Sequence, residues 1–146
     1  MSEWADNQTE RTKTMNANEQ AIAAVLAKYQ DALNQSDTNA VMKLYASDGV
    51  FMPQHFPSSV GADAVRKAYD AVFSAITLSV KFEVAEIHQV APDWVIARTN
   101  SAGTVKVKAT GGGGPEANQE LFVFQKIDDA WKIARYCFST TNPPRA

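Results

Sequence analysis

The N-terminal half of the chain has the hydrophobic spacing of amphipathic helices. In the stretch EQAIAAVLAKYQDALNQSD, apolar residues recur three or four positions apart. These residues are Ile22, Val25, Leu26, Tyr29 and Leu33. The spacing places them on one face of a helix, for which Asn18 is a candidate N-cap.

Two further helices and a short strand are expected next. Asp37 can cap a second, short helix. The run GVFMP is typical of a strand that ends at Pro53, because proline has no N–H to donate to a neighbouring strand. Gly61 precedes a third helix, in which apolar residues that include Tyr69 again recur at helical spacing.

From Ser79 onward the period changes from helical to alternating. Four stretches have the pattern of strands: SVKFEVAEIHQV, WVIARTNSAGTVKVKA, QELFVFQKI and WKIARYCFST. The glycine-rich stretch TGGGGPEAN predicts a hairpin tip between the second and the third. Helices followed by such strands predict an α+β fold, with N-terminal helices packed against a mostly antiparallel sheet.

The last two predicted strands are apolar on both faces. Alternation in WKIARYCF puts Tyr136 and Phe138 on one face, and Ile133 and Cys137 on the other. A sheet with one solvated face alternates polar and apolar residues, so here both faces should be covered. We expect the helices to cover one face and a second copy of the chain to cover the other, which gives a homodimer. The alternative is that the N-terminal arm, with Trp4, folds over the outer face.

Composition and charge narrow the class of protein. The 146 residues fit one domain, at 18–143, preceded by a polar, mobile arm at 1–17. The formal net charge of −2 argues against a nucleic-acid-binding or anionic-membrane surface, which needs clustered lysine and arginine. The single cysteine, Cys137, excludes an internal disulfide. No stretch has the apolar length of a membrane span or the centre of a signal peptide, so we expect a cytoplasmic protein.

Three stretches together resemble a known superfamily. AKYQDALNQSDTNAVMKLYASDGVFMP, GADAVRKAYDAVF and ELFVFQKIDDAWKIARYCFSTTNP are similar to the nuclear transport factor 2-like superfamily, and most to its SnoaL-like, SgcJ/EcaC-type group. The resemblance implies a cone-shaped fold, in which a curved sheet wraps round the helices and encloses a pocket. The superfamily includes ketosteroid isomerases, polyketide cyclases, dehydratases and kinase association domains, so the fold alone assigns no function.

The resemblance to ketosteroid isomerases implies particular catalytic positions. In those enzymes a tyrosine and a protonated acid donate hydrogen bonds to a developing enolate, while an aspartate moves the proton. By motif the tyrosine falls on Tyr29 and the neutral acid on Glu120, but the aspartate falls on Pro53, which cannot act as a base. His55 is the candidate replacement; the alternative is that it lies on an exposed loop.

Glu120 and Arg98 support two mutually exclusive interpretations. Glu120 shares a strand face with Phe122, so burial would raise its pKa and keep the carboxyl protonated; the alternative is a solvated glutamate. Arg98 shares a face with Trp94 and Asn100, where a charge needs a partner. Arg98 either pairs with Glu120 across adjacent strands, which would leave Glu120 ionised, or binds a ligand carboxylate or phosphate.

Further residues are expected to line the same pocket. The predicted ligand-binding set is Met52, Tyr69, Trp94, Arg98, Asn100, Phe122, Tyr136 and Phe138. The alternative for the aromatic members is plain core. No third ligand accompanies His55 and His88 at metal-like spacing, so we expect no metal. The proton chemistry that the resemblance implies needs no cofactor.

Functions from different classes are open at this stage. One is a pocket protein for a small hydrophobic or carboxylate-bearing ligand: an isomerase, cyclase or dehydratase acting by acid–base chemistry on a polyketide-, polyene- or steroid-like substrate. The other is a non-catalytic association domain that works through the outer sheet face, or a ligand carrier without turnover. The expected partners are a small molecule and a second copy of the chain, and neither nucleic acid nor a membrane.

Overall fold

The computed structural model describes residues 15–144. The predicted N-terminal arm, with Trp4, lies almost entirely outside this range. Within it the elements run in chain order as α2 (Ala17–Asn34), α3 (Thr38–Met42), β1 (Tyr45–Met52), β2 (Ser59–Val60), α4 (Ala62–Ala75), β3 (Ile76–Ala91), β4 (Trp94–Val107), β5 (Gly113–Ile127) and β6 (Ala130–Thr140).

Local sequence explains where the helices begin. The N-cap of α2 is Asn16, and not Asn18 as predicted: its side chain accepts a hydrogen bond from the N–H of Glu19, whose side chain accepts one from the N–H of Asn16. This reciprocal capping box fixes the start of the helix. Asp37 caps α3 and Gly61 precedes α4, as predicted. No helix in the described part of the chain is long and apolar enough to cross a membrane.

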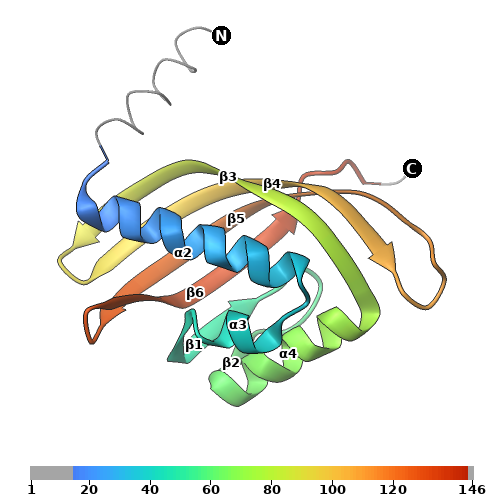
Figure 1. Ribbon diagram of the computed structural model, residues 1–146, viewed down its shortest axis with the longest axis horizontal. Helices are drawn as coiled ribbons and strands as arrows, with labels where there is room; N and C mark the ends of the chain where they lie inside the picture. The colour runs from blue at the N-terminus through green and yellow to red at the C-terminus, as the bar shows by residue number, and fades with distance from the viewer. Residues whose placement is uncertain (1–14, 145–146) are drawn as a thin grey trace, which may run out of the picture.

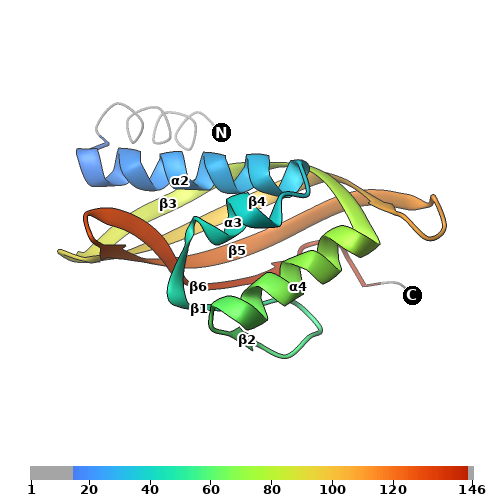
Figure 2. The same ribbon diagram turned by 60° about the horizontal axis from the view of Figure 1, so that its bottom comes forward.

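The strands form one curved sheet that the helices cover on one side. Its order is β2-β1-β6-β5-β4-β3, and all neighbours are antiparallel except β1 and β6. Figure 1 shows α2 running across the sheet, and Figure 2 shows the helices gathered on the same side of it. This arrangement confirms the predicted α+β cone.

A β-bulge in β6 changes which residues face the core. Phe124 of β5 lies opposite Ile133, whereas Val123 lies opposite Arg135, so Ala134 is an extra residue in β6. Ile133 is therefore fully buried with the aromatic residues further along the strand. The prediction that Ile133 lies on the opposite face was wrong, because the bulge reverses the phase of the alternation.

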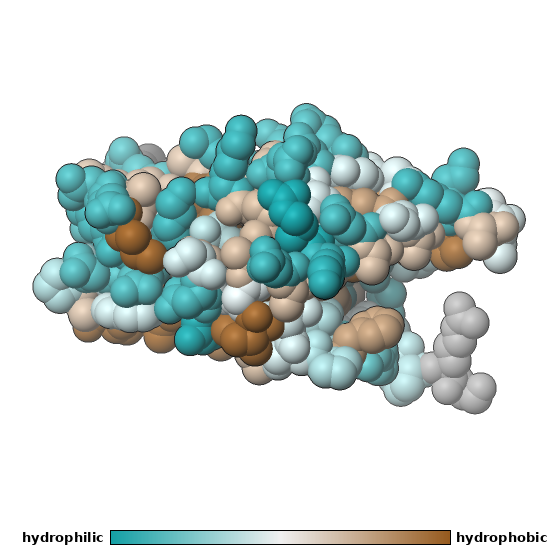
Figure 3. All heavy atoms as spheres, turned by 90° about the horizontal axis from the view of Figure 1, so that it is seen from below, coloured by the Kyte–Doolittle hydropathy of each residue, from teal (hydrophilic) through white to brown (hydrophobic). Residues whose placement is uncertain are grey.

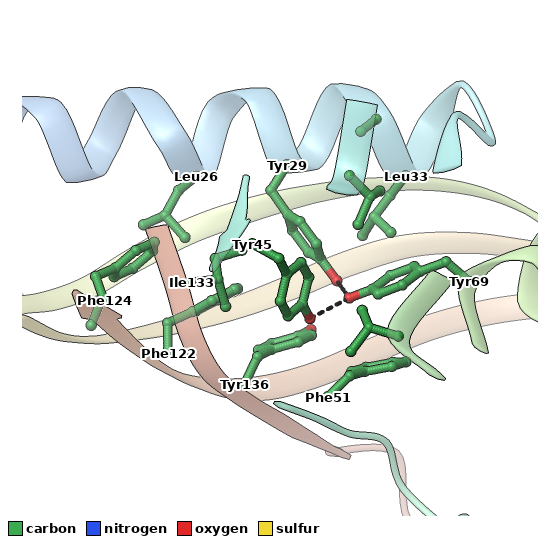
Figure 4. Packing of buried hydrophobic residues seen from close by; sticks show 14 of the residues in the cluster. Leu26, Tyr29, Leu33, Tyr45, Phe51, Tyr69, Phe122, Phe124, Ile133 and Tyr136 are labelled. Atoms are coloured by element: carbon green, nitrogen blue, oxygen red, sulfur yellow. Dashed lines mark hydrogen bonds between the residues drawn. The ribbon is translucent and has the colours of Figure 1, made fainter. Parts of the chain in front are cut away.

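The core fills the space between the helices and the sheet face that they cover. Its largest fully buried side chains include Tyr29 of α2, Tyr69 of α4 and Phe122 of β5. The rings meet at close range: the centroids of Phe122 and Tyr136 are 4.2 Å apart in a stacked pair. Figure 4 shows these side chains converging from α2, α4 and the sheet, with the tyrosine hydroxyls pointing toward one another.

The opposite sheet face carries a band of apolar residues, which we call the outer patch. It consists of Met52, Trp94, Ile96, Leu121, Val123 and Cys137, all of them exposed or half-buried. Strand register makes them neighbours, because Cys137 lies opposite both Met52 and Leu121, and Ile96 lies opposite Val123. Figure 3 views the molecule from below and shows scattered brown, apolar areas on a largely polar surface.

Candidate functional site

A cavity of about 660 Å³ lies between the helices and the sheet. Side chains from α2, α4, β3, β4, β5, β6 and the segment after β1 form its wall, which is mostly apolar. This volume and lining are those of a site for a small organic molecule. The polar groups of the wall are few, so each of them restricts what the cavity can bind.

All four tyrosines of the chain meet at the buried side of the cavity. The hydroxyl oxygen of Tyr69 lies 2.7 Å from that of Tyr29 and 2.7 Å from that of Tyr45 (Figure 4). The hydroxyl of Tyr136 in turn interacts with that of Tyr29. Burial raises the pKa of each tyrosine, so all four keep their protons at neutral pH. Four protons serve three hydrogen bonds, which leaves one O–H that can be donated to a ligand oxygen.

Glu120 is the buried carboxyl of the cavity wall. Only 5% of its surface is exposed. Thr99 Oγ1 donates a hydrogen bond to its Oε1 at 2.6 Å, and Ser101 Oγ donates one to its Oε2 at 2.5 Å. Burial raises the pKa of Glu120 to about 7, although these two hydrogen bonds lower it. Near neutral pH the carboxyl therefore exists in both protonation states, as a proton-transferring group requires.

A second carboxyl lies further along the same wall. Glu116, Asn118 and Glu120 occupy alternate positions of β5, so they face the same side of the sheet, and all three line the cavity. Glu116 is half-buried. Burial raises the pKa of Glu116 as well, while a hydrogen bond from the Asn118 side chain lowers it.

Five of the predicted site residues line this cavity. They are Tyr29, Tyr69, Glu120, Tyr136 and Phe138. Phe122 lies behind the wall, fully buried and packed against the ring of Tyr136. The structure thus brings together the tyrosine and the acid that the resemblance implied, whereas their catalytic roles stay a prediction.

Three other predicted residues lie on the outer face of the sheet. Trp94, Arg98 and Asn100 are all exposed and take no part in the cavity wall. The Nε atom of Arg98 lies 2.5 Å from Oε1 of Glu86, and both side chains are exposed. The predicted ion pair between Arg98 and Glu120 was therefore wrong, and so was the expectation that these three residues converge on the cavity.

The error in β4 has a physical reason. The inward face of this strand carries small or polar side chains, Ala97, Thr99 and Ser101, whereas Trp94 and Ile96 on the outward face are larger and more apolar. Hydrophobicity alone therefore favoured the wrong face. Of these three inward residues only Ser101 lines the cavity, whereas Ala97 belongs to the packed core and Thr99 binds Glu120.

His55 and Met52 also lie outside the cavity wall. His55 sits in an exposed turn at a positive φ of 72°, with its Nε2 atom 2.7 Å from Nε2 of Gln54. Met52 is 43% exposed and belongs to the outer patch. Pro53, the position to which the resemblance assigned the aspartate, does line the cavity. The proposed replacement base is thus not placed on the cavity, and Glu120 is the better-placed group for moving a proton.

Sequence reasoning missed several polar residues of the wall. The residues that were not predicted are Ser101, Glu116, Asn118 and Gln54. The Gln54 side chain accepts a hydrogen bond from the N–H of Thr140, which connects the segment after β1 to the end of β6. The alternation of polar residues in PEANQE was the available signal. Among the described residues, no three histidine, cysteine or acidic side chains are grouped to hold a metal ion.

Comparisons with known proteins agree on the family. The SnoaL-like domain matches residues 26–136. The chain is similar to the crystal structure of a ketosteroid isomerase-like protein from Erwinia carotovora atroseptica, with 36% identity and a TM-score of 0.84 over 88% of this chain and 100% of the other. A nuclear transport factor 2-like superfamily protein from Salmonella enterica has the same fold at 16% identity, with a TM-score of 0.74 over 85% and 91% of the two chains. No curated protein matches the sequence.

Proposed function

Because the chain belongs to the SnoaL-like domain family, we propose that its cavity binds a mostly apolar carbonyl compound and that Glu120 moves a proton on it. The reaction class is that of an isomerase, cyclase or dehydratase. One observation carries the proposal. It is a buried carboxyl, with a pKa of about 7, on the wall of an apolar cavity and near the tyrosine hydroxyls.

The geometry supports the following division of roles. The spare tyrosine O–H, at Tyr29 or Tyr136, donates a hydrogen bond to the carbonyl oxygen of the ligand. Ionised Glu120 removes a proton from the carbon next to that carbonyl, and the electron pair of the broken C–H bond moves onto the oxygen as an enolate. Where the ligand has a double bond next to that carbon, the enolate is conjugated with it, and the protonated carboxyl returns its proton to the far carbon of the conjugated system. Hydrogen-bond donors aimed at such an oxyanion stabilise the transition state most strongly where water is excluded.

Thr99 and Ser101 position the carboxyl in this scheme. Their hydroxyls bind one oxygen of Glu120 each, which fixes the plane of the carboxyl. The same two bonds stabilise the ionised form, whereas burial opposes it. This balance keeps the pKa of Glu120 near neutral. The scheme gives Glu120 the role of the base that Pro53 cannot fill.

The proposal is tested by proton exchange on a model substrate. A β,γ-unsaturated steroid ketone is incubated with the protein in D₂O, and NMR follows deuterium uptake next to the carbonyl and migration of the double bond. Glu120→Gln should lower the exchange rate by about 10²- to 10⁴-fold, since it removes the general base. Glu83→Gln, the same change on an exposed residue of β3, should leave the rate unaltered.

The outcomes separate catalysis from binding. Binding of the ketone without exchange would mean that the cavity serves a carrier and not an enzyme. Exchange that survives in Glu120→Gln would show that another group is the base. In the second case the proposed role of Glu120 is wrong, even though the cavity is used.

We further propose that the chain forms a homodimer through the outer patch. The supporting observation is the exposure of large apolar side chains there: Leu121 is 40% exposed and Trp94 38%. A contiguous apolar area on a sheet face is a common interaction surface. The residues lie on the side of the sheet opposite the cavity, so dimerisation and ligand binding can be altered separately.

A further inference from the structure

The ionisable side chains of the cavity wall, the tyrosines apart, are all acidic. Glu116 and Glu120 both line the cavity, and no lysine, arginine or histidine is found among the described residues of its wall. The other polar groups there, such as Ser101 and Asn118, are neutral. A wall of this composition repels a carboxylate or a phosphate and attracts a cation. Arg98, once the candidate partner of a ligand carboxylate, lies on the other face of the sheet.

The two carboxyls stand at separate points along one strand. Glu116 and Glu120 are four residues apart on the same face of β5, which corresponds to about 13 Å of extended chain. Glu120 is buried next to the tyrosines, while Glu116 is half-buried and lies opposite Gly103 of β4. A rigid ligand of two or three rings can span this distance. Its two ends would then meet different carboxyls.

The surroundings of the two carboxyls differ in one respect. Glu120 accepts a hydrogen bond on each oxygen, from Thr99 and Ser101. Glu116 has the neighbouring Asn118 side chain as its hydrogen-bonding partner. No ion pair to Glu116 occurs in the described part of the chain. The charge of a half-buried carboxylate is thus left without a cation.

The two lysines that precede Glu116 most closely in the sequence do not supply that cation. Lys106 is exposed, on the face of β4 that carries Arg98 and Asn100. The Nζ atom of Lys108 donates a hydrogen bond to the main-chain carbonyl of Phe73 at 2.6 Å. An ammonium group brought by a ligand would therefore find an unpaired carboxylate, and charge-assisted hydrogen bonds of this kind are stronger than neutral ones.

We infer that the natural ligand of the cavity is an elongated, mostly apolar amine, whose ammonium group is bound by Glu116 while a carbonyl or phenol at its other end is bound at Glu120 and the tyrosines. This inference rests on the proposed function, since it names the substrate class of the same cavity. In this inference Glu116 and Asn118 select ligands that carry an ammonium group, while Glu120 transfers the proton. It also excludes the carboxylate-bearing class of ligand.

The test uses ligands that differ only in the charge of one end. We would titrate the protein at pH 7 with 4′-(aminomethyl)biphenyl-4-ol, its hydroxymethyl analogue and its carboxylic acid analogue, and measure each dissociation constant by calorimetry. A phenanthrene series with the same three end groups covers a second shape. The amine should bind at least tenfold more tightly than the alcohol, and the acid at least tenfold more weakly.

Two variants test whether Glu116 causes the preference for the amine. Glu116→Gln should reduce the preference for the amine over the alcohol at least fivefold and leave the affinity for the alcohol within twofold. Glu83→Gln removes an exposed carboxyl from β3 and is the matched control for net charge, so it should keep the wild-type preference. An amine preference that persists in Glu116→Gln would overturn the assignment to Glu116.

The remaining outcomes distinguish this inference from the proposed function. Equal binding of the three end groups, or tightest binding of the acid, would overturn the inference and leave ligand binding by the cavity intact. If no member of either series binds, the inference fails, whereas the proposed function is decided separately by deuterium exchange on the steroid ketone.

Discussion

Glu120 links the site to the stability of the fold. Its pKa is about 7 in the folded protein, against 4.5 as the ordinary value, because burial disfavours the charged form. Between these pH values the unfolded chain has lost the proton while the folded chain keeps it. The free energy of unfolding therefore falls as the pH rises through this window. The stabilisation is complete below pH 4.5 and is lost above pH 7.

A glutamine at this position should remove that dependence. The shift corresponds to a loss of about 3 kcal/mol in the free energy of unfolding of the wild type from pH 4.5 to 7.5. Glu120→Gln cannot ionise, so its urea-unfolding free energy should lack this decline. Burial raises the pKa of Glu116 too, so a smaller decline in the same direction should persist in the variant. Parallel pH profiles for wild type and Glu120→Gln would contradict the assignment of the neutral pKa to Glu120.

Among single residues, the cavity residues that could be predicted from the sequence are those that a family motif marks. Tyr29 and Glu120 could be predicted because a family motif marks them, and both line the cavity. Ser101 could not, since a short polar residue in a strand is as common on a solvated face as on a cavity wall. His55 was attractive as a base by its chemistry alone, but its side chain is not part of that wall.

At the level of elements, strand phase was the least predictable quantity. The helices could be located from a spacing that persists over several turns, and their predicted positions agree with α2, α3 and α4. In β6 the extra residue Ala134 reverses the alternation, which no residue pattern announces. In β4 the hydrophobic pattern indicated the wrong face, because the inward side chains Ala97, Thr99 and Ser101 are smaller or more polar than Trp94 and Ile96 on the outward face.

The pairing of β3 with β4 depends on one glycine next to the cavity. Gly103 lies opposite Val80 on β3 and Glu116 on β5. A Cβ atom at Gly103 would press against the carbonyl oxygen of Ser79 and lie 2.7 Å from the Cα of Val80, and both are main-chain atoms that cannot turn aside. The sheet can approach this closely only where the side chain is absent.

Gly103→Ala should therefore be strongly destabilising. We expect the free energy of unfolding to fall by about 3 kcal/mol or more, since the overlap is with the main chain and not with a flexible side chain. Gly114→Ala is the matched control, because a Cβ there meets no atom within 4 Å; its effect should stay within about 0.5 kcal/mol. Urea unfolding measures both. Equal stabilities of the two variants would mean that β3 and β4 are less closely paired at Gly103 than described.

At the scale of the whole molecule, the sheet separates two surfaces. The face covered by the helices holds the cavity, and the opposite face holds the outer patch. The sequence predicted apolar residues on both faces, and the β-bulge reduces the outer set by placing Ile133 in the core. Ile133 is therefore unsuitable for testing the dimer, because a charge there would unfold the protein.

Leu121 is the residue at which the proposed dimer should be tested. It is 40% exposed near the middle of the outer patch, opposite Cys137 on one side and Arg98 on the other. In a two-fold dimer each substitution occurs twice, so Leu121→Lys brings two cations into an apolar interface, each next to an arginine. The dimer should dissociate at least tenfold more readily, as measured by sedimentation equilibrium.

The control is an equally apolar residue outside the patch. Val60 of β2 is 67% exposed, so Val60→Lys makes the same chemical change on another surface and should leave the dimer intact. Both variants should bind cavity ligands as the wild type does, because neither residue lines the cavity. If wild type and Leu121→Lys have the same mass in solution, the outer patch is not the dimer interface. Loss of ligand binding together with the dimer would instead show that the two faces of the sheet are coupled.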